Sequence, residues 1–587
     1  MALFRSKEAT TTASSGGLAT ASAVGRNGAE CMRIGQVLVD TEQLSAEHLA
    51  TALHEARGDV LQFVDIATGR FGAGRSETAT AIAEVFGLQA ADTRNLDVQP
   101  GLAAALPEAV ARHHCVVAVE DRNGTLVMLS AAPTTDTDTA VRSAVKRPIT
   151  WMASDPATIR TIIDRSYRAD ADIDRLVQAF EQPQVQHRGL DQVSEIDLDD
   201  QAPVVQLVNR VVGQALRDRA SDIHIEPLDD QLRIRFRIDG HLVETFTMPM
   251  GVHAPLTSRL KIMSGMNIVE KRRPQDGQFS TVVDGRDVDV RVGSVSTVFG
   301  EKVVMRILDK QRSMIGLDQL GFPRETYLHY SKLIHSPFGM VICAGPTGAG
   351  KTTTLYATLA EINSLGKNVT TIEDPVEYIV PGINQIQTND QAGLTFATGL
   401  KAILRQDPDV ILVGEMRDAD TARIAVQSAL TGHFVLSSLH GTDSVSALHR
   451  LLDMGIEAFL VASSVVGVIG QRLLRRICDS CKEPYSPPAD ELAVFRQHSG
   501  GSDKAQFFRG AGCAFCSGTG YRDRIGVYEL LRITPELRRL LIGWATTEEL
   551  RRLAVAQGMR TMLREAMALV ENDVTTVPEV VRTLFAS

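Results

Sequence analysis

The chain has 587 residues, 44% of them hydrophobic and 22% charged, proportions that indicate a globular protein of several domains. Its formal net charge of −10 argues against a protein that coats nucleic acid, although a local basic groove is compatible with that charge. The N-terminus carries no apolar segment typical of a signal peptide, so we expect the chain to be cytoplasmic. The longest apolar run, residues 458–470, is short and interrupted by serines, and it predicts a core helix rather than a membrane span.

The N-terminal part of the chain predicts a disordered segment, a first domain and a linker. Residues 1–30 are rich in Ser, Thr, Ala and Gly, which favours disorder. In the first expected domain, residues 31–167, hydrophobic residues follow Arg33 at helical spacing. Two later apolar runs flank Arg122-Asn123-Gly124, which predicts a hairpin. Residues 168–203 contain a helix-like piece and then an acidic segment, and we expect a solvated tether there.

The second expected domain covers residues 204–312. Between Leu232 and Ile238, apolar residues alternate with arginines, a pattern that predicts a half-buried strand. We interpret the three arginines of this strand as a solvated or interface face; they are Arg233, Arg235 and Arg237.

Residues 318–476 alternate short apolar runs with helical segments, which is the pattern of a parallel α/β sheet. The expected strands cover residues 340–344, 369–372, 410–413 and 434–437. Because ligands bind at the carboxyl ends of strands in such sheets, the segments that follow these strands are the first candidates for a functional site.

A glycine-rich loop follows the first strand and fits the P-loop pattern G-x-x-x-x-G-K-[ST] at every fixed position. Its residues are Gly345, Pro346, Thr347, Gly348, Ala349, Gly350, Lys351 and Thr352. The glycines let backbone N–H groups surround a phosphate, and the next helix adds the partial positive charge of its N-terminus. We expect Lys351 to reach the β and γ phosphates and Thr352 to hold Mg²⁺. The alternative, a chance glycine-rich turn, does not explain the strand and helix around it, so the chain is expected to bind ATP or GTP.

Three polar segments follow the other strands. Glu373, Asp374 and Glu377 can hold the waters of Mg²⁺ or polarise a nucleophile, and a helix-capping acidic loop is the alternative. Glu415 is the candidate base that orients and activates water, with a surface glutamate as the alternative. His440 lies at the end of the fourth strand, where it can contact the γ-phosphate, although a lone histidine is usually structural.

Four cysteines form two Cys-x-x-Cys pairs in residues 477–530, and they are Cys478, Cys481, Cys513 and Cys516. Each pair can present two thiolates to one tetrahedral Zn²⁺. Because all four positions are thiolates and none is left for water, the metal is expected to be structural. Two disulfides or four ordinary thiols are the alternatives, and a cytoplasmic location disfavours the disulfides. The remaining residues, 531–587, read as helical, with a capping box at Thr546-x-x-Glu549.

The loop and the three polar segments, in this order, resemble the secretion ATPase superfamily, and within it the GspE/PilB-like ATPases of type II secretion and type IV pilus assembly (T2SSE). Strings in the second domain add to the resemblance, among them residues 220–227, 235–240, 273–277 and 300–308. The resemblance covers roughly residues 204–585. It implies a hexameric ring with a RecA-like ATPase core and a PAS-like second domain.

The same resemblance assigns two arginines of the second domain to the nucleotide. Arg291 and Arg306 would approach the phosphates, where a fixed cation acts as an arginine finger. Ordinary strand arginines facing solvent are the alternative. The chain departs from the family pattern at two positions. Gly441 follows His440 in a segment that differs from the usual histidine motif, and Gln278 stands where the family usually has arginine. These departures bear on rate and on contacts between subunits.

The start of the first domain resembles an MshEN/T2SSE-N-type domain through Arg33-Ile34-Gly35-x-x-Leu38. In some relatives this domain binds cyclic di-GMP through two such motifs. The expected second copy, around Phe71-Gly72-Ala73-Gly74, fits poorly. The default expectation is therefore a docking domain for a membrane platform partner, with cyclic di-GMP as the alternative ligand.

Together these patterns predict a multidomain α/β protein. It would contain an α/β N-terminal domain, a PAS-like α+β second domain, a RecA-like P-loop core and a small zinc module. The implied function is a hexameric Mg²⁺-dependent ATPase that uses ATP to drive type IV pilus assembly or type II secretion. Its partners would be further copies of itself, an inner-membrane platform protein and the docking partners of that protein. It would lie at the inner membrane as a peripheral cytoplasmic protein.

Two alternatives from other classes remain open at this stage. One is a nucleic-acid translocase on the same core, which the net charge and the aromatic content of 5% disfavour, so no nucleic acid is expected. The other is a nucleotide-binding scaffold without turnover, which only the altered histidine string supports.

Overall fold

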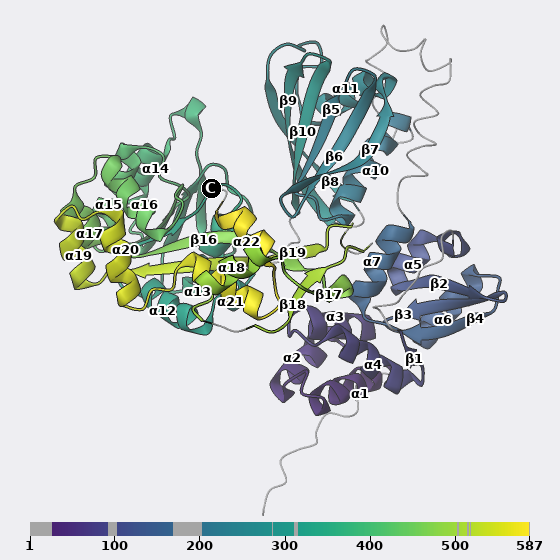
Figure 1. Cartoon of the computed structure of the whole chain (residues 1–587). Helices are drawn as coiled ribbons and strands as arrows, with labels where there is room; N and C mark the ends of the chain where they lie inside the picture. The colour runs from purple at the N-terminus through teal and green to yellow at the C-terminus, as the bar shows by residue number, and fades with distance from the viewer. Residues whose placement is uncertain are drawn as a thin grey trace, which may run out of the picture. The chain divides into compact units, whose positions relative to one another are not determined.

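The computed structural model describes residues 26–91, 102–167, 202–283, 286–309, 315–501, 504–513, 516 and 518–585. The chain divides into two compact units, Met1–Arg168 and Ala169–Ser587, each of which is described by itself (Figure 1). Most of the acidic linker and residues 1–25 of the segment expected to be disordered lie outside the described residues. The first helix begins at Arg26, inside the segment for which the sequence predicted disorder.

Unit 1 combines a group of four helices with a four-stranded sheet. The four helices are α1 (Arg26–Asp40), α2 (Ala46–Ala56), α3 (Val60–Gly69) and α4 (Arg75–Phe86). The sheet has the order β1 (Gln89–Ala90), β4 (Ile149–Ala153), β3 (Thr125–Ser130), β2 (Val116–Arg122). Its helices are α5 (Glu108–His114), α6 (Thr135–Ala144) and α7 (Pro156–Ser166). Strands β2 and β3 pair antiparallel across Asn123-Gly124, which confirms the predicted hairpin.

Gly35 of α1 lies at a close helix crossing in unit 1. A Cβ at this position would lie 2.2 Å from Leu49 Cδ1 and 3.0 Å from Phe63 Cζ. Both neighbours belong to the buried core of α1–α4. Packing alone therefore explains why this position requires glycine, whether or not the neighbouring Arg33 binds a ligand.

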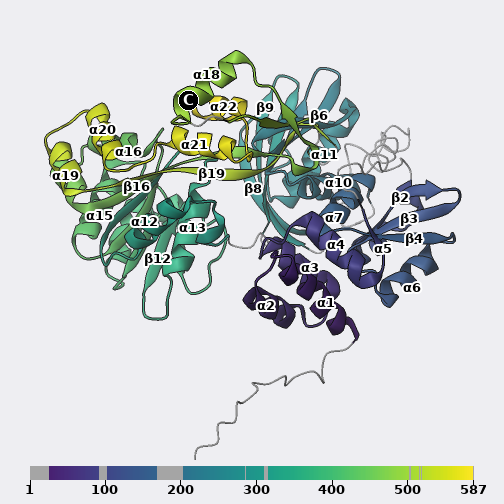
Figure 2. The same cartoon turned by 60° about the horizontal axis from the view of Figure 1, so that its bottom comes forward.

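The second domain begins unit 2 with a six-stranded antiparallel sheet covered on one face by two helices (Figure 2). The helices are α10 (Pro203–Arg217) and α11 (His253–Met263). The strand order is β7 (His241–Pro249), β6 (Gln231–Ile238), β5 (Asp222–Pro227), β10 (Gly300–Asp309), β9 (Arg286–Thr297), β8 (Gln275–Val283). Strand β6 buries alternate residues against the helices, as its sequence predicted.

The arginines of β6 lie on the other face and are ion-paired rather than simply solvated. Arg233 and Arg235 approach the carboxylate of Glu226 at 3.1 and 2.8 Å, and Lys302 reaches it at 2.9 Å. The Glu226 side chain is buried beneath these three cations. The face is thus a charge cluster within the second domain.

The third expected domain is built on a seven-stranded sheet between two helical layers (Figure 1). Its order is β13 (Asn384–Gln387), β12 (Val369–Glu373), β14 (Val410–Val413), β15 (Phe434–Leu439), β11 (Gly339–Ala344), β16 (Val465–Ile477), β19 (Tyr521–Arg532). All pairs are parallel except β16 with β19. Helices α12 (Arg324–Ile334) and α13 (Lys351–Ile362) pack on one face. The other face carries α14 (Phe396–Ile403), α15 (Ala419–Leu430), α16 (Ser444–Asp453) and α17 (Ala458–Ser464).

The four strands predicted in this core are confirmed, whereas the helix predicted over residues 458–470 is wrong in its second half. Helix α17 ends at Ser464, and β16 begins at Val465. The segment from Val465 to Ile469 is rich in β-branched residues, which favour a strand buried on both faces. Its neighbours β11 and β19 supply the backbone partners.

The described residues of the C-terminal part add a two-stranded sheet and five helices. Strands β17 (Lys482–Tyr485) and β18 (Phe507–Gly510) pair antiparallel. The helices are α18 (Ala489–His498), α19 (Pro535–Ile542), α20 (Thr547–Ala556), α21 (Met562–Glu571) and α22 (Val577–Leu584). The capping box predicted at Thr546 and Glu549 is present at the start of α20. Across the described ranges, no helix combines the length and apolarity that a membrane crossing requires.

Short 3₁₀ turns also occur among the described residues. They are η1 (Leu102–Ala105), η2 (Met250–Val252), η3 (Leu317–Gln319), η4 (Asp390–Ala392) and η5 (Asp479–Cys481). The multidomain α/β class expected from the sequence is confirmed.

Candidate nucleotide site and metal site

The glycine-rich loop runs from the end of β11 to the start of α13. Gly348 and Gly350 have φ of +76° and +86°, the left-handed region that glycine tolerates. Lys351 Nζ donates to the carbonyls of Gly345 and Pro346, at 2.9 Å each. Burial lowers the pKa of the Lys351 ammonium, opposed by the nearby Cys343 and Glu415. The loop therefore holds a partly buried cation that bonds to neutral acceptors, as a phosphate-binding loop requires.

Glu373, at the end of β12, is fully engaged in hydrogen bonds. Its carboxylate accepts the Tyr356 hydroxyl and, at 2.6 Å, the hydroxyl of Thr371. Gln385 Nε2 adds a third donor at 3.3 Å. Because the side chain is buried and both of its oxygens accept hydrogen bonds, Glu373 fixes the shape of the loop after β12, whereas Asp374 is exposed and Glu377 is half-buried.

Glu415 follows β14 and lies close to the acidic loop. Arg417 pairs with Glu415, and its other nitrogen lies 3.3 Å from Asp374 Oδ2. The hydrogen bond to Glu415 is the main reason why the pKa of Arg417 is raised. A Cβ on Gly414 would press on Glu373 Cα at 3.3 Å, so this glycine lets the two strand ends approach. The candidate base and one candidate Mg²⁺ ligand are thereby joined through one guanidinium.

The two histidines around β15 have different environments. His440 is exposed at the carboxyl end of the strand, on the same sheet edge as the P-loop. His433 precedes the strand, and its Nδ1 lies 3.0 Å from the Ser428 carbonyl. His433 is therefore structural, and His440 is the histidine available to a ligand.

The two arginines of the second domain also differ. Arg291 donates to the carbonyl of Val376, in the acidic loop, at 3.3 Å. Arg306 pairs with Asp222 of its own domain at 3.0 Å. Within the described part of the chain, no contact joins Arg306 to the P-loop. The structure thus places Arg291 against the loop after β12 and leaves Arg306 in a local ion pair.

Sequence reasoning missed Gln471 and Arg472, two polar residues of β16, the strand that pairs with β11. The side-chain oxygen of Gln471 accepts hydrogen bonds from Thr354 at 2.8 Å and from Cys343 at 3.4 Å. The main-chain carbonyl oxygen of Gln471 would lie 2.8 Å from a Cβ on Gly345. Arg472 follows it and is buried. Polar side chains inside a long apolar run were the signal that could have marked them.

The four thiols predicted to bind zinc converge. All four sulfur atoms lie within 4.8 Å of one another. Sγ of Cys478 and Sγ of Cys513 are 3.8 Å apart, and those of Cys481 and Cys516 are 3.9 Å apart. Zn–S bonds of about 2.3 Å in a tetrahedron require sulfur separations of about 3.8 Å. The donor set and its spacing fit a tetrahedral zinc site, and none of the cysteines forms a disulfide.

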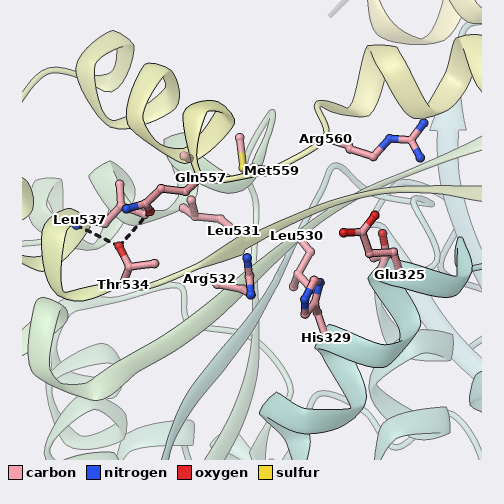
Figure 3. A pocket seen from close by; sticks show the side chains of 13 residues that line it. Glu325, His329, Leu530, Leu531, Arg532, Thr534, Leu537, Gln557, Met559 and Arg560 are labelled. Atoms are coloured by element: carbon pink, nitrogen blue, oxygen red, sulfur yellow. Dashed lines mark hydrogen bonds between the residues drawn. The ribbon is translucent and has the colours of Figure 1, made fainter.

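A small cavity lies between α12, β19 and the helices α19–α20, apart from the two candidate sites (Figure 3). Glu325 and His329 of α12 and Arg532 of β19 line it. Thr534 bonds to Gln557 at 2.9 Å on one side. Its volume of about 30 Å³ accommodates little more than a water molecule, so it is not a substrate site.

Comparison with known proteins identifies two family domains. The family described as Type II/IV secretion system protein matches residues 197–582. The MshEN domain matches residues 86–184. The motif at Arg33 lies outside that second match.

Several curated proteins resemble most of the chain. The type IV pilus assembly ATPase PilB of Myxococcus xanthus is 37% identical, covering 94% of this chain and 98% of that protein. The type II secretion system protein E of Xanthomonas campestris is 39% identical over 88% of this chain and 92% of that protein. Among solved structures, the ATPase DotB of Legionella pneumophila shares the fold at a TM-score of 0.50 and 20% identity, covering 64% of this chain and 94% of that one.

Proposed function

Because this chain belongs to the Type II/IV secretion system protein family, we propose that it is a ring-forming motor that converts ATP hydrolysis into movement of a pilus or pseudopilus. That it is a secretion or pilus assembly ATPase follows from the family. The observation that carries the motor proposal is the convergence of Lys351, Glu415 and the loop after β12 at one sheet edge.

We assign the roles of the site residues from their positions. The loop from Gly345 to Thr352 binds the phosphates, with Lys351 exchanging its two carbonyl acceptors for phosphate oxygens. Glu415 orients and activates the attacking water. His440, exposed at the adjacent strand end, contacts the γ-phosphate and reports its loss.

Mg²⁺ and Zn²⁺ are the metals that the residues fit. Thr352 and the carboxylates of Asp374 and Glu377 are hard oxygen ligands suited to Mg²⁺ or its waters, and Mg²⁺ would neutralise phosphate charge. Glu373 supports them from beneath, since its own oxygens are occupied by protein donors. The four thiols fit a structural Zn²⁺ that closes the module of β17 and β18.

A hexameric ring would place the second domain over the nucleotide edge. The contact of Arg291 with Val376 supports this, because closing the second domain on the acidic loop brings a cation to the phosphates. Arg306 would have to exchange Asp222 for a phosphate, which makes it the arginine that depends on domain closure. Movement of this kind is what would turn hydrolysis into mechanical work.

Unit 1 would dock on the cytoplasmic partners of an inner-membrane platform protein and would so hold the ATPase at the membrane. The MshEN match supports this assignment. Cyclic di-GMP binding at Arg33 has less support, since the matched segment begins at residue 86 and Gly35 is explained by packing. A titration of unit 1 with cyclic di-GMP, for the wild type and Arg33→Ala, would decide it.

ATP hydrolysis tests the proposal directly. Mg²⁺-dependent phosphate release should rise in specific activity with protein concentration and fall at least about 100-fold in Glu415→Gln, whereas ATP affinity is retained. Asp420→Asn, an exposed carboxylate on α15, is the matched control and should behave as wild type. Binding without turnover, even with the platform partner present, would favour the scaffold, and ATPase stimulation by single-stranded nucleic acid would favour the translocase.

A further inference from the structure

One buried cation near the P-loop has no role in the site described above. The residue Arg472 is 5% exposed, and the one hydrogen bond that its guanidinium makes in the described structure goes from Nη1 to the Gln471 carbonyl at 3.2 Å. Within the described residues, no carboxylate lies within ion-pair distance of it. A buried guanidinium with a single neutral acceptor is costly unless an anion joins it.

The position of Arg472 links it to the phosphate loop. Strand β16 pairs with β11 up to Gly470 and Ala344, so Arg472 lies beside the first residues of the loop. The Gln471 carbonyl that accepts its hydrogen bond is the one that packs against Gly345. Lys351 donates to the carbonyl of the same Gly345. The two cations therefore donate to neighbouring carbonyls at the start of the loop, Lys351 to that of Gly345 and Arg472 to that of Gln471.

Lys351 and Arg472 also share their chemistry. Both donate only to main-chain carbonyls, and burial lowers the pKa of each. Arg472 also lowers the pKa of Lys351, so the charges are close enough to repel. Glu415 attracts Lys351 and Asp443 attracts Arg472, but among the described residues neither carboxylate lies within ion-pair distance, so the two cations can still accept a multivalent anion.

The side chain of Arg472 borders an open pocket. A pocket of about 360 Å³ lies between the end of β16 and the helices α16, α20, α21 and α22. Its carboxylates are already satisfied, because Asp443 caps α16 and pairs with Arg551 at 2.9 Å. Glu529 accepts from the backbone of Ser444 and Met562. Arg472 thus has open space beside it, and Asp443 attracts it across this pocket without forming an ion pair in the described structure.

We propose that Arg472 is a second phosphate-binding residue. Its guanidinium gives up the hydrogen bond to the Gln471 carbonyl and contacts the phosphates of a nucleotide on the P-loop. This inference rests on the proposed function, since it requires a nucleotide there. It gives the strand β16 a direct part in nucleotide binding and connects the phosphates to the Asp443 region beyond the pocket.

The test is titration of full-length wild type, Arg472→Gln and Arg472→Lys with fluorescent ATP and ADP, with salt varied. Because Arg472→Gln loses one charged contact, it should bind ATP and ADP about 10- to 100-fold more weakly than wild type. The affinity of this variant should also depend less on salt. Arg472→Lys should recover part of the affinity, because it restores the charge. Arg551→Gln is the matched control, since Arg551 lines the same pocket but is paired, and it should bind within about 3-fold of wild type.

Melting temperature and zinc content measured on the same samples separate binding from folding. Arg472→Gln that binds ATP and ADP like wild type overturns the proposal. So does an equal loss in both Arg472 variants that follows a lowered melting temperature, since that indicates a purely structural role. Wild type that binds no nucleotide, together with Lys351→Ala unchanged from it, refutes instead the proposed function itself.

Discussion

Arg417 forms an ion pair with Glu415, the glutamate assigned to activate water. The same guanidinium reaches Asp374, so one exposed side chain holds both carboxylates at the nucleotide edge. A base that must orient water benefits from a fixed position, since catalysis by a carboxylate depends on geometry before acidity.

Replacing Arg417 should therefore slow hydrolysis more than it weakens binding. For Arg417→Gln we expect kcat to fall about 10-fold while KM stays within about 3-fold, because a positioning contact is lost and the phosphate contacts remain. Steady-state phosphate release measures both constants. Arg423→Gln on α15, whose partner Asp420 is exposed, is the control and should leave both unchanged. An unaltered kcat for Arg417→Gln would show that Glu415 needs no such support.

The buried bond between Tyr356 and Glu373 should contribute more to stability than a comparable neutral bond. Tyr356→Phe leaves a buried carboxylate short of one donor, which we expect to cost about 1–3 kcal/mol. Tyr330→Phe is the matched control, because that hydroxyl bonds Thr358 at 2.8 Å in the same core. Denaturant unfolding of the two variants compares them, and equal losses would mean that Glu373 does not depend on its phenolic donor.

The sequence predicted the sheet and the P-loop well because both depend on local patterns. Short apolar runs with loops between them define β11, β12, β14 and β15, and the glycine pattern defines the loop. The run from Ala458 to Gly470 was harder, since a fully buried strand and a buried helix look alike by periodicity. Only its neighbours β11 and β19 decide that its second half is a strand.

The contacts that divide roles among site residues come from pairs far apart in sequence. Nothing near Glu373 indicates that Tyr356 will occupy its oxygen, and nothing near Arg306 indicates Asp222 as its partner. Arg472 was overlooked because it stands in an apolar strand without a motif. Such roles follow from tertiary packing, which a motif does not encode.

Removal of zinc should unfold the module that contains Cys478, Cys481, Cys513 and Cys516. Substitution of a cysteine outside this cluster should not affect zinc binding. We expect one Zn²⁺ per chain, released by a strong chelator and absent from Cys513→Ser, with loss of the order in β17 and β18. Metal analysis and hydrogen exchange of residues 477–530 measure this. The control is Cys343→Ser, which replaces a buried thiol near the P-loop, and this variant should contain as much zinc as wild type. A protein that contains no zinc and resists the chelator would indicate that the thiols serve otherwise.

Acid should remove the stabilisation that the charge cluster around Glu226 supplies. Burial alone would raise the pKa of Glu226, but the hydrogen bonds from Arg235 and Lys302 outweigh it and lower the pKa from 4.5 to about 2. Since the folded pKa lies below the unfolded one, the stabilisation is complete above pH 4.5 and disappears as the pH falls towards 2. The shift corresponds to about 3 kcal/mol at neutral pH.

Glu226→Gln should therefore melt at a lower temperature than wild type at pH 7, because three cations then surround a neutral amide. The difference in stability should narrow by about 2 kcal/mol between pH 7 and pH 3, as the wild type loses its advantage. Melting curves of the full chain at both pH values test this, with the exposed Glu244→Gln on β7 as control. A gap that stays constant with pH would show that the three cations do not hold Glu226 ionised in the folded protein.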